Sequence, residues 1–125
     1  MAAPQHPADS VSGAAAASFS AGTVVVVSLA NPREKFWGAI LELSAAGLGI
    51  RGIDLNSFDD YVSLLRAGEA YGPGEVFFPM HRVERIEADL SNGGIPSVAE
   101  RFFTVTGKPA SALLGTDQPR SVPRQ

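Results

Sequence analysis

The sequence predicts a mainly β domain: a small five-stranded antiparallel barrel, with one helix inserted before the fourth strand and one helix after the fifth. Three observations predict this fold. Short apolar, β-branched runs recur between residues 23 and 88, separated by turn residues. A helical apolar spacing interrupts them after the third run. Gly38, Gly47 and Gly49 lie in or beside the runs, and the strong twist they permit favours a barrel over an open sheet.

The first three strands are predicted from a continuous apolar stretch. Residues 23–29 (TVVVVSL) form a β-branched run, and residues 31–34 (NPRE) are typical of a type I turn. Residues 35–43 follow as the second strand, whose two faces are both mostly apolar, so we expect both to be covered. After a turn at 45–47, residues 48–53 form the third strand. Sequential strands with tight turns pair antiparallel.

The inserted helix is predicted at 58–67. Phe58, Tyr61, Val62 and Leu65 have the spacing of one helical face, Ser57 is the expected N-cap, and Gly68 follows as the stop. Residues 76–80 (VFFPM) and 83–88 (VERIEA) are then the fourth and fifth strands. A proline cannot donate to a ladder, so the fourth strand is expected at an edge.

A second helix is expected within the C-terminal segment 91–114. The residues at 97–100 (SVAE) form a capping box, and Gly107 ends the helix. A helix this short is marginal alone, so its apolar face must dock. We expect Phe102 or Phe103 to cover the outer face of the second strand around Trp37. Residues 110–114 are expected to add one last turn.

Composition limits the function. The chain has 125 residues, 45% of them hydrophobic and 18% charged, which fits one globular domain of residues 21–90 plus the helical segment. A net charge of −3 argues against a general nucleic-acid binder. The absence of cysteine and the presence of only two histidines argue against a metal site. No phosphate-loop, dinucleotide or nucleophile-elbow motif is present, so we expect no enzyme and no cofactor.

Both ends of the sequence are expected to be disordered tails, at residues 1–20 and 115–125, because they are rich in small residues and proline. No basic segment precedes an apolar run, so a signal peptide is not expected. The valine run at 24–27 is too short to span a bilayer. These features predict a cytoplasmic protein without a membrane partner.

The segment 22–88 resembles the Sm-like family of SH3-like small barrels, including its bacterial RNA-chaperone branch. Gly38-Ala39-Ile40 matches the bent second strand of that family, the spacing through Leu43 and Leu48 to Ile50 has no gap, and residues 81–86 (HRVERI) resemble its second motif. The sequence departs from the family at Ser44, where an acid is usual, and it lacks the asparagine of the RNA-facing loop. Its helix at 58–67 is inserted, and the N-terminal helix is missing.

The resemblance implies a non-catalytic interaction module that forms a homo-oligomer by pairing the fourth strand of one subunit with the fifth of the next, with a protein or RNA partner. The residues it points to for self-association are Val76, Phe77, Phe78, Val83, Ile86, Phe102 and Phe103. Candidates for ligand or RNA contact are Trp37, Arg51, His81, Arg82 and Arg85. Trp37 also fits a core position, and His81 an ordinary surface position near a turn.

An alternative resemblance is to PilZ domains, which bind cyclic di-GMP. Glu42, Ser44 and Gly47 stand at the positions of that family's acid/Asn-x-Ser-x-x-Gly element, with glutamate in place of the usual residue. The family also has an arginine pair upstream, where this sequence has only Arg33. Two guanidinium groups clamp phosphates and stack on guanine rings. This alternative implies a cyclic di-GMP receptor.

Overall fold

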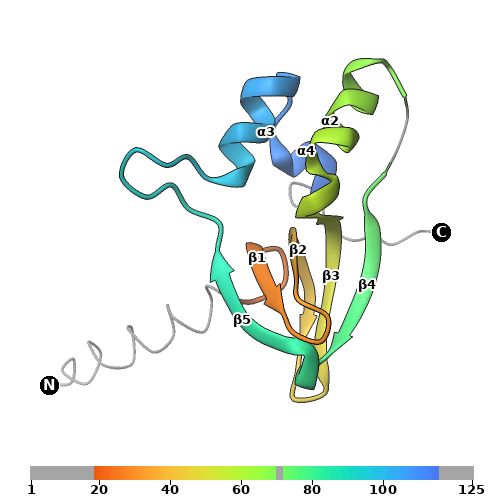
Figure 1. The fold of residues 1–125 in the computed structure, drawn as a ribbon, viewed down its shortest axis with the longest axis vertical. Helices are drawn as coiled ribbons and strands as arrows, with labels where there is room; N and C mark the ends of the chain where they lie inside the picture. The colour runs from red at the N-terminus through yellow and green to blue at the C-terminus, as the bar shows by residue number, and fades with distance from the viewer. Residues whose placement is uncertain (1–18, 70–71, 116–125) are drawn as a thin grey trace, which may run out of the picture.

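The computed structural model describes residues 19–69 and 72–115, and these residues form one five-stranded antiparallel sheet with a group of helices over one end (Figure 1). The strands are β1 (Val24–Leu29), β2 (Glu34–Leu43), β3 (Gly47–Asp54), β4 (Gly74–Pro79) and β5 (Val83–Ala88). The helices are α2 (Phe58–Arg66), α3 (Val98–Thr106) and α4 (Ala110–Leu114). Short 3-10 turns, η2 (Leu55–Ser57) and η3 (Met80–Arg82), precede α2 and β5.

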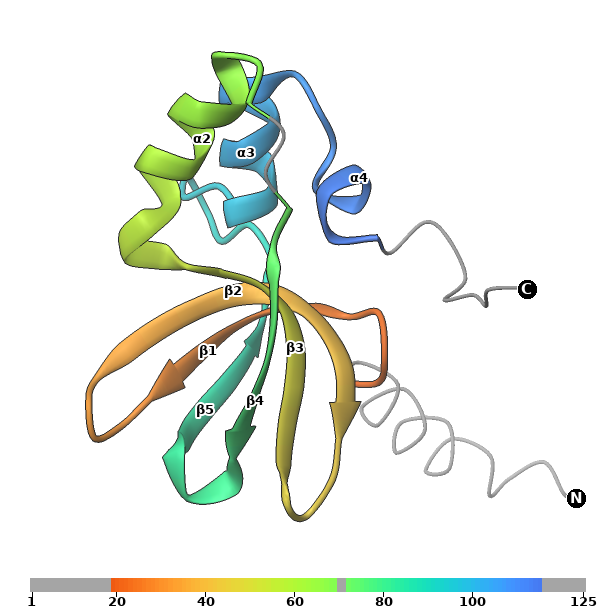
Figure 2. The same cartoon turned by 90° about the vertical axis from the view of Figure 1, so that its right-hand side faces the viewer.

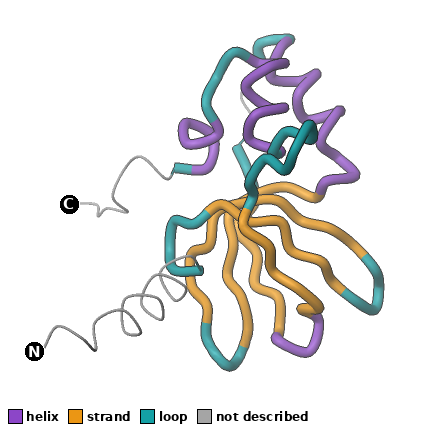
Figure 3. The backbone as a smooth tube through the Cα atoms, turned by 90° about the vertical axis from the view of Figure 1, so that its left-hand side faces the viewer, coloured by secondary structure: helices purple, strands orange, loops and turns teal. Residues whose placement is uncertain are grey.

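The strand order is β4-β3-β2-β1-β5, so the last two strands lie at opposite edges of the sheet although η3 joins them through only three residues. Such a short link requires the sheet to curl, as Figure 2 shows from one side and Figure 3 from the opposite side. The described residues contain no ladder between β4 and β5. The expected antiparallel five-stranded sheet is therefore confirmed, but the sheet is not closed, so the expected barrel is not confirmed.

The sheet separates two hydrophobic clusters. Alternate residues of β2 point to opposite faces, so Phe36 and Ile40 join the inner cluster, inside the curl, while Trp37 and Ala39 join the outer cluster, under the helices. The inner cluster is built from strand residues alone, and the outer one from strand and helix residues. The expectation that both faces of the second strand are covered is confirmed.

The bend of the sheet occurs where two glycines face each other. Gly38 on β2 pairs with Gly52 on β3, and a Cβ atom on Gly38 would lie 2.8 Å from the Cα of Gly52. A Cβ on Gly52 would lie 2.6 Å from the Cα of Gly38. No side chain fits at either position, which explains why β2 and β3 approach so closely here. Gly49, by contrast, has no atom closer than 3.8 Å to such a Cβ.

The helices begin and end close to the expected positions. Ser97 and Glu100 form the capping box of α3, and Gly107 ends it with a positive φ of 76°. Gly68 follows α2 with a φ of 89°. Ser57 occupies the N-cap position of α2, but its side chain makes no capping hydrogen bond. The carboxylate of Asp54 instead accepts from the Asn56 amide and caps η2.

Two local expectations are wrong. The Asn31–Pro32 peptide bond is cis and Asn31 has a φ of 55°, so the segment is not the type I turn that its sequence favours. Phe19, expected in the N-terminal tail, packs against the inner cluster. The rest of that tail, residues 1–18, and residues 116–125 lie outside the described residues. Among the described helices none is long and apolar enough to cross a membrane.

Candidate functional site

The first candidate surface is the free edge of β4. Val76 and Phe77 on this strand are 38% and 52% exposed, although both are large apolar residues. The ring of Phe77 lies beside Gly47 of β3, where a Cβ atom would come within 2.6 Å of it. Phe78 turns inward and meets the ring of Phe36 edge-on at 5.4 Å. The edge therefore combines an apolar surface with backbone groups that β3 does not use.

The opposite edge is formed by β5. Val83 and Ile86 are half-buried against the inner cluster, and Glu84, Arg85 and Glu87 are exposed. β5 pairs with β1 on one side, and no strand among the described residues pairs with its other side. Its contribution to an interface would therefore come from its backbone and its charged side chains rather than from Val83 or Ile86.

Trp37 does not lie on a binding surface. It is fully buried, its ring packs at 5.8 Å from Phe102 and 6.1 Å from Phe58, and its indole Nε1 donates a 3.0 Å hydrogen bond to Asp89. The Asp89 carboxylate also accepts from the Val98 and Ala99 amides at the start of α3. The interpretation of Trp37 as a stacking residue does not fit this position, and its alternative as a core residue does.

The cationic candidates do not form a single patch. Arg51 on β3 is paired with Glu75 and donates to the Leu114 carbonyl of α4, so it attaches that helix to the sheet. Arg82 in η3 donates to the carbonyls of Ala30 and Pro32. Its position by the β1–β2 turn is therefore structural.

Two candidates remain exposed. His81 is an exposed residue of η3, and Arg85 on β5 lies 3.6 Å from Glu87. The five residues expected to contact a ligand or RNA are thus divided between the core, the α4 contact, η3 and the β5 edge. Sequence reasoning could not foresee this division, because it depends on which strands become neighbours.

Among the residues of the alternative resemblance, Glu42, Ser44 and Gly47 lie at the β2–β3 end of β2, and Arg33 lies apart from them. Ser44 and Gly47 form the tight β2–β3 turn through two backbone hydrogen bonds, and the Ser44 hydroxyl accepts from the Ala46 amide. Arg33 precedes β2 at its other end. A ten-residue strand spans about 30 Å, so Arg33 and Ser44 cannot hold one ligand together. This geometry does not support a cyclic di-GMP site of the expected composition.

The two phenylalanines of α3 have different environments. Phe102 is 1% exposed and covers Trp37, as expected for the docking residue of this helix. Phe103, by contrast, is 56% exposed. Of these two candidates for self-association, Phe102 is therefore unavailable in this structure, while Phe103 is accessible.

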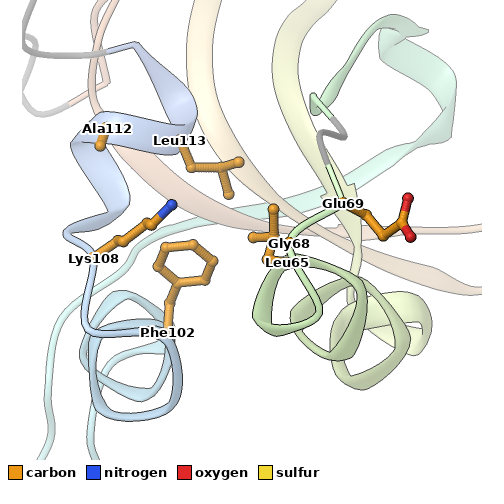
Figure 4. A pocket seen from close by; sticks show the side chains of 7 residues that line it. All are labelled: Leu65, Gly68, Glu69, Phe102, Lys108, Ala112 and Leu113. Atoms are coloured by element: carbon orange, nitrogen blue, oxygen red, sulfur yellow. The ribbon is translucent and has the colours of Figure 1, made fainter.

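A pocket of about 400 Å³ opens between the three helices. Its apolar lining includes Phe102, Leu65 and Leu113, and Figure 4 shows the Lys108 amine directed into it while the Glu69 carboxylate points away. The sequence did not indicate this pocket because its lining comes from the end of α2, the middle of α3 and the segment through α4. A mostly apolar lining with one amine is typical of a pocket that binds a small ligand.

The described residues contain no group of three or more side chains suited to hold a metal ion. Comparison of the chain with protein-family models, with curated proteins and with solved structures returned no match in any of the three.

Proposed function

We propose that this chain is a non-catalytic interaction module that self-associates through the two edges of its sheet. The fourth strand of one copy pairs with the fifth strand of the next, as the Sm-like resemblance implies. The observation that carries the proposal is the β4 edge, where Val76 and Phe77 are exposed on a strand that has a neighbour on one side only. Natural proteins rarely leave an apolar edge strand uncovered.

The arrangement of the edges supports a head-to-tail assembly. β4 and β5 are different strands at opposite edges of one antiparallel sheet, so each copy would offer both halves of the interface. Such a heterologous contact forms a ring where the rotation closes. The strand order and the three-residue η3 link support the finer proposal that the fold is a small barrel of Sm-like or SH3-like type.

Light scattering of the full chain at micromolar concentration tests this proposal. The expected mass is a multiple of 13.1 kDa, and it should not change after nuclease treatment. A mass that falls with nuclease would instead mean that RNA holds the copies together. A 13.1 kDa species at every concentration contradicts self-association.

A matched pair of variants locates the interface. Phe77→Glu places a charge on the exposed β4 edge and should reduce the mass to that of a monomer. Leu64→Glu places the same charge on α2, where Leu64 is 37% exposed and belongs to neither edge strand, and should leave the mass unchanged. Circular dichroism of both variants shows whether each remains folded. Loss of assembly in both, with folding intact, would place the interface elsewhere.

A further inference from the structure

The outer face of β1 contains a buried hydroxyl group that has no partner. Ser28 is 9% exposed, and its Oγ makes no hydrogen bond among the described residues. The preceding residues on the same face of the strand are Val24 and Val26, which pack against the outer cluster. Buried polar groups are normally satisfied, so this hydroxyl indicates a partner from outside the described residues.

Two cationic residues flank this hydroxyl. In the sheet register, Ser28 pairs with Lys35 of β2 on one side and with Arg85 of β5 on the other. Directly paired residues place their side chains on the same face, so the three form a row across three strands. The register shifts between Ser28 and Leu29, which leaves Glu84 as an extra residue in β5. Bulges of this kind redirect side chains locally.

This row borders a cavity of about 460 Å³ at the β1–β2 end of the sheet. The charged residues of its lining are Arg33, Glu34, Lys35, Glu84 and Arg85. Glu34 also lies 3.6 Å from Arg82, and Arg85 lies 3.6 Å from Glu87. Three cations against two carboxylates give the lining a net positive charge, and the two charged neighbours outside the lining, Arg82 and Glu87, offset each other.

We propose that this cavity binds a tetrahedral oxyanion, either inorganic phosphate or the phosphate group of a small monoester. The Ser28 hydroxyl would donate to one oxygen, while the Lys35 ammonium and the Arg85 guanidinium would pair with the others. The side chains of Lys35 and Arg85 are exposed, so both are accessible to an anion in the cavity. The tests of this site and of self-association are separate, because phosphate binding is measured here rather than mass, although Arg85 lies on the β5 edge that the proposed interface uses.

Thermal unfolding of the full chain with inorganic phosphate and, separately, with glycerol 3-phosphate tests the proposal. Sodium chloride at the same ionic strength is the reference. A ligand that binds only the folded state raises the melting temperature as its concentration increases. Both probes should do so, and a larger effect of glycerol 3-phosphate would identify a monoester as the preferred source of the group. If neither raises the melting temperature above the chloride reference, the proposal is wrong.

Ser28→Ala gives the sharpest control, because its two expected effects have opposite signs. Without phosphate the variant should melt at the same temperature as the parent protein or higher, since an unsatisfied buried hydroxyl is removed. Its affinity for phosphate should fall about tenfold, the effect of one hydrogen bond to a charged group. Lys35→Gln should weaken binding similarly, and Arg66→Gln, which removes an exposed cation on α2, should not. Unchanged binding in Ser28→Ala and Lys35→Gln would overturn the proposed site.

Discussion

The Asp89 side chain joins β2 to the start of α3. It follows β5, and its carboxylate accepts one hydrogen bond from the Trp37 indole and two from the first amides of α3. It therefore acts as a second cap for α3 beside the Ser97 capping box, and it satisfies a donor that would otherwise be buried. The capping box could be predicted because it is local, whereas the role of Asp89 could not, since its partners come from β2 and from the start of α3.

Replacing Asp89 with alanine should lower the free energy of unfolding by about 2–3 kcal/mol, because it removes a helix cap and leaves the Trp37 N–H unsatisfied. Urea unfolding followed by circular dichroism measures the change. Glu87→Ala is the matched control, an exposed carboxylate on β5 whose loss should cost no more than about 0.5 kcal/mol. Equal losses in the two variants would mean that the Asp89 contacts carry no net stability.

Tyr61 gives a prediction about alkaline pH. Burial raises the pKa of its phenol above the ordinary value of 10.0. The unfolded chain therefore loses this proton at a lower pH than the folded protein does. With respect to this group, stability is constant below about pH 10 and falls as the pH rises from there through the folded pKa.

The Tyr61→Phe variant should lack the part of the alkaline loss of stability that comes from the phenol. Urea unfolding of both proteins at about pH 8 and about pH 11 isolates the contribution, because the other ionising groups are common to both. The free energy of unfolding should fall more in the parent protein than in the variant. An identical fall in the two would show that Tyr61 does not contribute to the pH dependence.

At the scale of elements, α3 shows how far an amphipathic pattern can be interpreted. The sequence indicated a helix with too much apolar surface to stand alone, and the strand face that it covers could be anticipated from Trp37. The choice between Phe102 and Phe103 could not be anticipated. Adjacent residues of a helix differ by about 100° in direction, and both phenylalanines belong to the apolar pattern of this helix. The structure selects Phe102, which meets Trp37 and lines the interhelical pocket.

The adjacent phenylalanines provide a matched test of this docking. Phe102→Ala should destabilise the protein by about 3–5 kcal/mol, since it empties a site that is 1% exposed. Phe103→Ala should change stability by no more than about 0.5 kcal/mol, since its ring is mostly in solvent. Thermal or urea unfolding of the two variants compares them directly. A large loss in Phe103→Ala would show that this ring is covered in solution, which would favour a place in the self-association interface.

At the scale of the whole molecule, the number and approximate positions of the strands could be predicted, but which candidate site residues lie together could not. The strands appear as local runs in the sequence, and turn residues separate them. The placement of Arg33 and Ser44 at opposite ends of β2, and of Arg51 against α4, follows from strand length and order instead. The row of Arg85, Ser28 and Lys35 likewise exists only because β5 pairs with β1. No pattern within any one of these strands indicates it.

The pairing of β1 with β5 also has a consequence for how the chain folds. β1, β2 and β3 are consecutive hairpins, whereas Val25 meets Ala88 only after about 60 intervening residues have been placed. Until then, one edge of the valine-rich strand Val24–Val27 has no partner. Four consecutive β-branched residues on an open edge are a hazard for aggregation during synthesis and refolding. Arrival of β5 ends that exposure, so the last strand of the sheet protects the first.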